Sequence, residues 1–175
     1  MRRFLVSAAA AASALALVSG CATGTDAVAT GGTFDFVSPG GQTDIFYDPP
    51  SDRGAVGELS GPDLMDEGAT TSLSDFEGGA DDLEEVYENT KDLGVQFLGI
   101  NVRDNAQDKA QDFVIDNNVS YPSIYDPPMR TLTALGGVPT SVVPTTVVLD
   151  RHHRVAAVFL RELLAEDLQP VVERV

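Results

Sequence analysis

Sulfhydryl groups and basic side chains are scarce in this chain of 175 residues. The chain contains one cysteine, two histidines and no tryptophan, and its 27 acidic residues outnumber its 11 lysines and arginines. A single cysteine excludes an internal disulfide and a cysteine-rich zinc site. A formal charge of −16 leaves no basic surface for DNA or RNA, so nucleic acid is excluded as a partner. The length suits one domain.

The first 21 residues have the pattern of an export signal. Two arginines precede a 15-residue apolar stretch, residues 4–18, which is short for a membrane-spanning helix and matches the core of a signal peptide. The small residues before Cys21 resemble a bacterial lipobox, so we predict a lipoprotein signal peptide at 1–21 with the lipid attached to Cys21. An ordinary secretion signal with a chance cysteine is the alternative. Two acyl chains on Cys21 would hold the protein in the outer face of the cell membrane.

The part after the signal is strongly acidic and begins with a predicted tether. Nine basic residues remain there against 27 acidic ones once the two arginines of the signal are set aside, which gives −18. Residues 22–32 are small, polar and rich in glycine, which is typical of a flexible linker. We therefore expect one globular domain, residues 33–175, to be joined to the membrane by a flexible segment.

Strand and helix patterns alternate along the predicted domain. Alternating apolar residues at 33–37 and 43–47, with Pro and Gly between them, predict an N-terminal β-hairpin. Helical spacing predicts helices at 80–93, 105–117, 126–135 and 165–175, and runs of apolar and β-branched residues predict strands at 95–102, 145–150 and 155–159. This order predicts an α/β sandwich.

Four segments resemble, in order, those of extracytoplasmic thioredoxin-like proteins. They are Ser-Leu-Ser-Asp-Phe-Glu-Gly at 72–78, the strand at 95–101, Tyr-Pro-Ser-Ile-Tyr-Asp at 121–126, and Val-Pro-Thr-Thr-Val-Val-Leu-Asp-Arg at 143–151. With the lipobox, the resemblance is to TlpA/ResA-type lipoproteins of the redoxin, or thiol–disulfide oxidoreductase, family. It covers about residues 33–175 and implies a thioredoxin-like sandwich.

The resemblance also implies a substrate-facing surface and a class of reaction. In the family, the proline that corresponds to Pro144 has a cis peptide bond and faces the active site, between Val143 and Thr145. Members reduce or exchange disulfides, and several reduce apocytochrome c thiols before haem attachment. Apocytochrome c or a membrane thiol reductant is therefore an implied partner, in a role in cytochrome c maturation. No cofactor is implied.

The catalytic part of the family pattern is missing from this chain. Members follow the segment at 72–78 with an apolar strand and then Trp-Cys-x-x-Cys at the start of a helix. Here Gly78 is followed directly by Gly79 and an acidic helical pattern. A strand of about five to six residues, the redox turn and a first helical turn have dropped out, about 15 to 20 residues in all. The resemblance then implies a domain shortened at 78–79 whose central strand, between 95–102 and 145–150, is missing.

Because this segment is missing, we predict an inactive domain with an incomplete sheet. Dithiol exchange needs an attacking thiolate and a second, resolving thiol, but residues 22–175 contain no cysteine, and an acylated Cys21 is a thioether. We therefore expect no catalytic residue, and either direct pairing of the two flanking strands or an open sheet. An internal deletion or a faulty gene model is favoured over an evolved non-catalytic protein, because no compensating site is visible. The alternative function is a peptide-binding or scaffolding module that adds a strand at the Pro144 surface.

Two clusters of possible metal ligands are better explained as polar turns. Asp150, His152 and His153 are close in sequence and could bind a metal through imidazole, but they lie between two predicted strands. The carboxylates at 63–67 lack the spacing of an EF-hand loop. No metal site is predicted.

Overall fold

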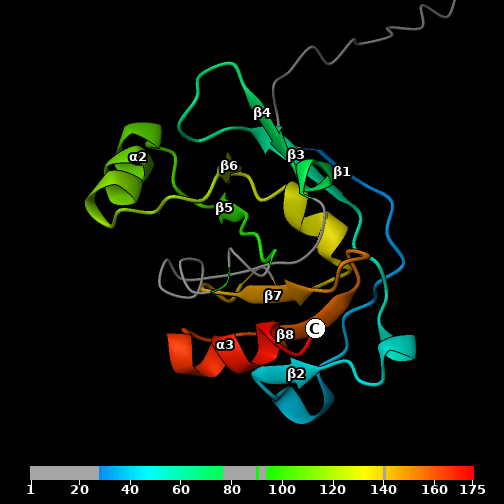
Figure 1. Cartoon of the computed structure of the whole chain (residues 1–175). Helices are drawn as coiled ribbons and strands as arrows, with labels where there is room; N and C mark the ends of the chain where they lie inside the picture. The colour runs from blue at the N-terminus through cyan, green and yellow to red at the C-terminus, as the bar shows by residue number, and fades with distance from the viewer. Residues whose placement is uncertain (1–27, 77–89, 91–93, 140) are drawn as a thin grey trace, which may run out of the picture.

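The computed structural model of the chain describes residues 28–76, 90, 94–139 and 141–175 (Figure 1). The described residues form two antiparallel sheets of three strands and one parallel pair. The first sheet has the order β1 (Val28–Thr30), β3 (Glu58–Pro62) and β4 (Thr70–Ser72); the second has the order β2 (Asp44–Phe46), β8 (Val155–Phe159) and β7 (Thr146–Leu149); β5 (Gly99–Asn101) pairs with β6 (Ser123–Tyr125).

Helical segments connect these strands. The α-helices with described bounds are α2 (Gln107–Asp116), between β5 and β6, and α3 (Ala165–Val172), after β8. Short 3₁₀ segments are η1 (Pro39–Gly41), η2 (Pro50–Asp52), η3 (Leu73–Asp75) and η5 (Thr131–Leu135). In the described part of the chain, no helix is long and apolar enough to cross a bilayer.

Strand β8 is the most completely buried element. All five of its residues are buried, and it is bonded to β2 on one edge and to β7 on the other. Its run Val-Ala-Ala-Val-Phe is apolar at every position, as expected where both faces of a strand are covered. Ala157 and Phe159 pack in a cluster with Leu168 of α3, while Val158 points to the opposite face. The alternation of a strand thus divides the core into two clusters.

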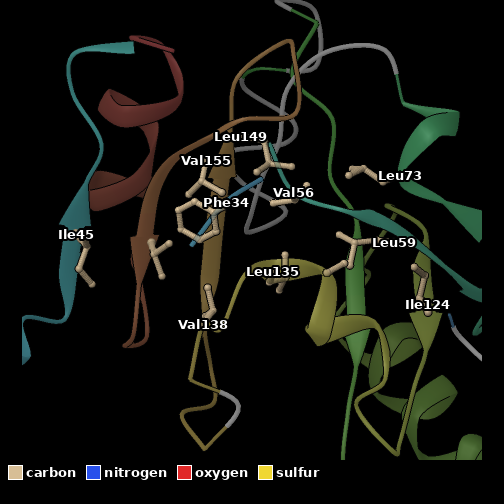
Figure 2. Packing of buried hydrophobic residues seen from close by; sticks show 12 residues of the cluster. Phe34, Ile45, Val56, Leu59, Leu73, Ile124, Leu135, Val138, Leu149 and Val155 are labelled. Carbon is tan, nitrogen blue, oxygen red and sulfur yellow. The ribbon is translucent and has the colours of Figure 1, made fainter. Parts of the chain in front are cut away.

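The second cluster brings together elements that are far apart in the sequence (Figure 2). Phe34, Val56 and Leu135 pack with Leu149 and Val155 at the β7–β8 end of the molecule. The same cluster continues to β3 and β6 through Leu59 and Ile124. Burial of apolar surface among these side chains, at about 25 cal/mol per Å², therefore holds the sheets together where no ladder of hydrogen bonds joins them.

Arg161 joins the end of β8 to β2 and α3. Its guanidinium lies 2.8 Å from Asp44 on β2 and 2.9 Å from Asp167 in the first turn of α3. The hydrogen bond from Arg161 lowers the pKa of both carboxyl groups. The ion pairs are partly exposed, so we assign them an orienting role rather than a large share of the stability.

The predicted N-terminal hairpin does not form. Residues 33–37 contain no strand, and β2 pairs with β8 instead. The backbone N–H groups of Thr33 and Phe34 donate to the carbonyl of Ala55, and that of Phe36 donates to the carbonyl of Gly136 at 2.6 Å. Gly136 has φ of +57°, and a Cβ there would collide with the backbone of Phe34. Phe34 enters the core by this close approach, which removes its segment from pairing with β2.

The prediction of a flexible tether at 22–32 is wrong for residues 28–30. Val28–Thr30 form β1, which pairs with Glu58–Ser60 of β3. Strand β3 itself lies in a stretch rich in Gly, Pro and Ser, a composition typical of loops. Pairing with a partner remote in the sequence overrides the local composition here. The predicted signal peptide, with Cys21, lies outside the described residues, as does the predicted helix at 80–93 apart from the buried Thr90.

The later elements agree better with the predictions. Strand β8 has the predicted bounds, β7 is one residue shorter at each end, and α2 and α3 lie within the predicted helices. Phe113, one of the apolar residues whose helical spacing predicts α2, is 64% exposed. The short helix predicted at 126–135 is reduced to the 3₁₀ segment η5.

In the part of the chain that the structure describes, the sheet is open between β5 and β7. Within the described residues these two strands belong to different sheets and have no ladder between them. This is one of the two arrangements expected from the loss of a central strand, and Figure 1 shows β5 and β6 on one side and β7, β8 and β2 on the other.

Candidate functional site

An apolar cleft lies between the two separated strands. It has a volume of about 300 Å³, and we call it the β5–β7 cleft. One wall is the segment around β5, with Leu98 and Ile100, and the other is the segment 142–147 that leads into β7. Leu132, Leu135 and Val138 close it from the η5 region. None of the residues that line it in the described structure carries a charge, so the cleft is suited to an apolar occupant.

The backbone of β5 presents one edge to β6 and the other to the cleft. The N–H of Gly99 donates to the carbonyl of Pro122, and the carbonyl of Asn101 accepts from the N–H of Asp126. Because backbone groups alternate in direction along a strand, Ile100 presents its N–H and C=O to the opposite edge. The cleft is therefore bordered by a strand edge capable of pairing.

Two polar side chains, one three residues before β5 and one at its last residue, are incompletely satisfied. Gln96 Oε1 and Asn101 Oδ1 are buried acceptors with no hydrogen-bond partner in the structure. A buried acceptor without a partner costs about 1–3 kcal/mol. The neighbourhood of β5 thus lacks polar partners as well as a second neighbouring strand.

The predicted site residues Val143, Pro144 and Thr145 all line the β5–β7 cleft. Val143 is 55% exposed, and the peptide bond between Val143 and Pro144 is cis. Thr145 Oγ1 donates to the carbonyl of Val142 at 3.0 Å, which orders the segment before β7. Their role toward a substrate remains a prediction.

The wall opposite these residues was not identified from the sequence. Leu98 and Ile100 belong to the apolar run predicted as a strand at 95–102, and both are only half-buried. The sequence did contain a signal for them, because the strand inferred to be missing is the neighbour of the predicted strand at 95–102. The contribution of η5, with Leu132 and Leu135, had no signal, because it depends on how the chain folds back after β6.

The polar cluster around Asp150 is a structural ion-pair network. Asp150 is 3% exposed and lies 2.7 Å from Arg154 and 3.4 Å from Arg53. Burial by itself would raise the pKa of Asp150, but hydrogen bonds from Arg154 and from the backbone of His152 outweigh it, so the pKa is lowered. The carboxylate of Asp150 therefore forms ion pairs with the guanidinium groups of Arg53 and Arg154. His153 Nε2 lies 3.0 Å from the carbonyl oxygen of Phe76.

The carboxylate of Asp63 is used within a turn. Its Oδ1 accepts from the backbone N–H groups of Met65 and Asp66 at 2.8 Å, and its Oδ2 accepts from Thr71. Burial opposes ionisation, but these hydrogen bonds together lower the pKa of Asp63. In the described part of the chain, no group of three or more His, Cys, Asp or Glu side chains is arranged to hold a metal ion.

Solved structures with the same fold include two close relatives. A secreted thiol-disulfide isomerase from Corynebacterium glutamicum is 48% identical, with a TM-score of 0.77, and the match covers 81% of this chain and 96% of that one. A DsbF homologue from Corynebacterium diphtheriae is also 48% identical, with a TM-score of 0.75, and the match covers 82% of this chain and 99% of that one. No curated protein matches the chain.

A more distant structure shows the same fold. A thiol:disulfide interchange protein of the thioredoxin family from Chlorobium tepidum has a TM-score of 0.57 at 18% identity, and the match covers 69% of this chain and 93% of that one. The family model described as Redoxin matches residues 77–173, more than half of the chain. By this match and by the identity to the two corynebacterial proteins, the chain belongs to the redoxin family of thioredoxin-like thiol–disulfide oxidoreductases.

Proposed function

We propose that this chain is an extracytoplasmic, lipid-anchored member of the family that does not catalyse thiol–disulfide exchange. The observation that carries the proposal is the absence of any cysteine in residues 22–175. Exchange requires one thiolate to attack a disulfide sulfur and a second thiol to release the mixed disulfide. Acylation of Cys21 would convert the remaining sulfur into a thioether, which cannot attack.

The location rests on the N-terminal segment and on a relative. The short apolar stretch at 4–18 followed by Cys21 supports export and lipid attachment. The similar protein from C. glutamicum is described as secreted. Together they support a domain held on the outer face of the cell membrane. From the family resemblance, we propose apocytochrome c or a membrane thiol reductant as the partner.

Insulin reduction tests the proposed inactivity. The full chain, reconstituted in lipid nanodiscs with dithiothreitol as reductant, should precipitate insulin no faster than a Cys21→Ser variant of the same chain. The similar isomerase from C. glutamicum serves as the positive control. Turnover clearly above the Cys21→Ser variant would overturn the proposal, and so would an intact mass of the mature chain that reveals an additional segment with a cysteine pair.

A binding function is the second candidate. The β5–β7 cleft favours it, because the cleft is apolar and the segment 143–145 forms one of its walls. A module of this kind would hold an extended peptide by backbone hydrogen bonds and side-chain pockets, without chemistry. It predicts saturable peptide binding in the same preparation that fails to reduce insulin.

A further inference from the structure

We propose that a groove between α2 and the turn at 63–69 docks a cationic segment of a partner protein that presents apolar side chains. The groove has a volume of about 500 Å³, and we call it the α2 groove. It shares only Tyr121 with the lining of the β5–β7 cleft. The inference therefore concerns a second surface, and it holds whether or not the chain catalyses thiol–disulfide exchange.

Helix α2 is attached to the turn by amide side chains. Gln107 and Gln111, one helical turn apart, both donate from Nε2 to the carbonyl oxygen of Leu64, at 3.2 Å and 2.8 Å. Ala110 is the only buried residue of the helix, and Figure 1 shows α2 at the margin of the molecule. Because polar contacts make this junction, apolar residues farther along the helix remain accessible, and the groove lies beside them.

Large apolar side chains enter the groove from both of its sides. Ile115 of α2 is 62% exposed, and Met65 of the turn is 45% exposed. The half-buried Val114 and Val119 also belong to the lining. Exposed apolar side chains that gather in a hollow with a polar rim are typical of an interaction surface. The partner should therefore supply apolar side chains.

The two segments that form the groove are strongly acidic. Residues 63–72 and 103–122 contain seven acidic and two basic residues, a net charge of −5. One of the two bases, Lys109, lies 3.0 Å from Asp112. Asp63 lines the groove as a carboxylate: burial raises its pKa, but the hydrogen bonds that it accepts within the turn lower the pKa further. A surface of this charge attracts a cationic partner and repels an anionic one.

The charge also argues against other occupants. A second copy of this chain would bring a charge of −16, and a bilayer surface with anionic lipids has the same sign. Residues 77–93, which lie largely outside the described structure, contain seven acidic residues and one lysine, and residues 22–27 contain one acidic residue and no basic one. The occupant that fits both the charge and the apolar lining is a cationic segment of another protein.

A synthetic peptide tests the proposal. The probe is fluorescein-labelled Lys-Leu-Ala-Lys-Leu-Leu-Ala-Lys-Leu-Ala-Lys, which has leucines at helical spacing. The full chain in phosphatidylcholine nanodiscs is titrated against it by fluorescence anisotropy, and empty nanodiscs measure binding to lipid. We expect saturable binding above that of empty nanodiscs, which weakens as the ionic strength rises.

Two control peptides separate charge from apolar contact. One has Glu in place of every Lys, and the other has Ser in place of every Leu. Each should bind at least about tenfold more weakly than the probe, a difference of about 1.4 kcal/mol. Equal affinity of either control, or probe binding no stronger than to empty nanodiscs, would overturn the proposal.

A matched pair of variants locates the apolar contact. Ile115 lines the groove, whereas Phe113 lies on the same helix outside the lining and is 64% exposed. Ile115→Ser should weaken probe binding about tenfold through lost apolar burial, and Phe113→Ser should leave it unchanged. Circular dichroism checks the fold of both, and Met65→Ser offers a second variant from the other side of the groove. Equal effects, or the reverse order, would refute the assignment.

A second pair of variants tests the charge. Asp66 and Asp116 are exposed, and each follows directly after a residue that lines the groove. Replacing both by Asn should weaken probe binding at least about fivefold and reduce its dependence on salt. The control variant carries Glu162→Gln and Glu166→Gln, two exposed acids outside the lining, and changes the net charge equally. An equal loss in the control would mean attraction to the overall charge and would contradict docking in the groove. The insulin assay bears on the proposed inactivity alone.

Discussion

Strands β8 and β5 differ in composition and in surroundings: β8 is Val-Ala-Ala-Val-Phe and β5 is Gly-Ile-Asn. Strand β8 is bonded on both edges and all five of its residues are buried, whereas β5 has three residues, all half-buried, and among the described strands it is bonded to β6 alone. The difference lies in their neighbours. A strand reaches full burial when both edges and both faces are covered, and no described strand covers the second edge of β5.

This contrast indicates where stability and binding capacity lie. The layer of β2, β8, β7 and α3 has a continuous core, with Phe159, Leu168 and Val148 each at most 2% exposed. The β5 side has a cleft and two unpaired buried acceptors instead. We infer that the first region maintains the fold and that the second is available to a ligand. Regions with few buried contacts open at lower free energy than the core.

The largest expected effect comes from the centre of the β8 layer. Phe159 is 2% exposed, and its ring lies 5.6 Å from that of Phe46 in an edge-to-face arrangement. Phe159→Ala should lower the free energy of unfolding by about 3–5 kcal/mol, through lost transfer energy and the cavity left behind. Urea unfolding followed by circular dichroism measures this change. A loss below 1 kcal/mol would mean that the β8 layer is not the stable core.

A smaller effect comes from two valines that face each other in the ladder. Val158 of β8 and Val147 of β7 are paired in register, but Val158 is fully buried and Val147 lines the β5–β7 cleft. Val158→Ala should cost about 2–3 kcal/mol, and Val147→Ala about 1 kcal/mol, because the second side chain already borders open space. The same unfolding experiment compares them. Equal losses would show that the cleft is packed as tightly as the core.

The same pair becomes more informative with ligand present. If a peptide bound in the β5–β7 cleft covers Val147, it should increase the cost of Val147→Ala toward that of Val158→Ala. The peptide stabilises the parent chain more than the variant when it contacts this side chain. An unchanged difference between the two variants at saturating peptide would argue that the peptide does not reach β7.

The smallest effect is expected in acid at the end of β7. The folded-state pKa of Asp150 lies below its ordinary value of about 3.9, so its ion pairs stabilise the fold above that value and are lost as the pH falls through it. The unfolding free energy should decline below about pH 4, and Asp150→Asn should make this decline shallower. Urea titrations between pH 3 and pH 6 test this. An identical slope in the variant would exclude Asp150 as a contributor.

Local patterns predicted the second half of the chain better than the first. The bounds of β8 were predicted without error because a short apolar run between polar turns, rich in β-branched and aromatic residues, is typical of a buried strand. The hairpin at 33–47 failed because its pattern identified an extended apolar segment but not the partner. Phe34 instead docks beside Gly136, about a hundred residues away in the sequence. Phe113 was misplaced for a related reason, since helical spacing predicts a face but not what covers it.

Only one of the two walls of the candidate site could be predicted from the sequence. The segment Val143–Thr145 was identified by its resemblance to a family pattern, and it does line the cleft. The facing wall, with Leu98 and Ile100, and the contribution of Leu132 were not predicted. They line a cleft only because β5 and β7 belong to different sheets. Two arrangements, direct pairing or an open sheet, were compatible with the sequence. The choice between them depends on the packing of η5 and the Phe34 segment against both strands.

The amino-acid sequence alone determined the chemistry of this protein: one cysteine before the domain and none within it decide that no dithiol can form, whatever the fold. It also determined the class of the fold, because patterns of apolar residues and a family resemblance survive the loss of a segment. The tertiary structure alone decided that β5 and β7 stand apart with an apolar cleft between them. Which strand edges pair depends on long-range packing, and local patterns contain no information about a partner that is distant in the chain.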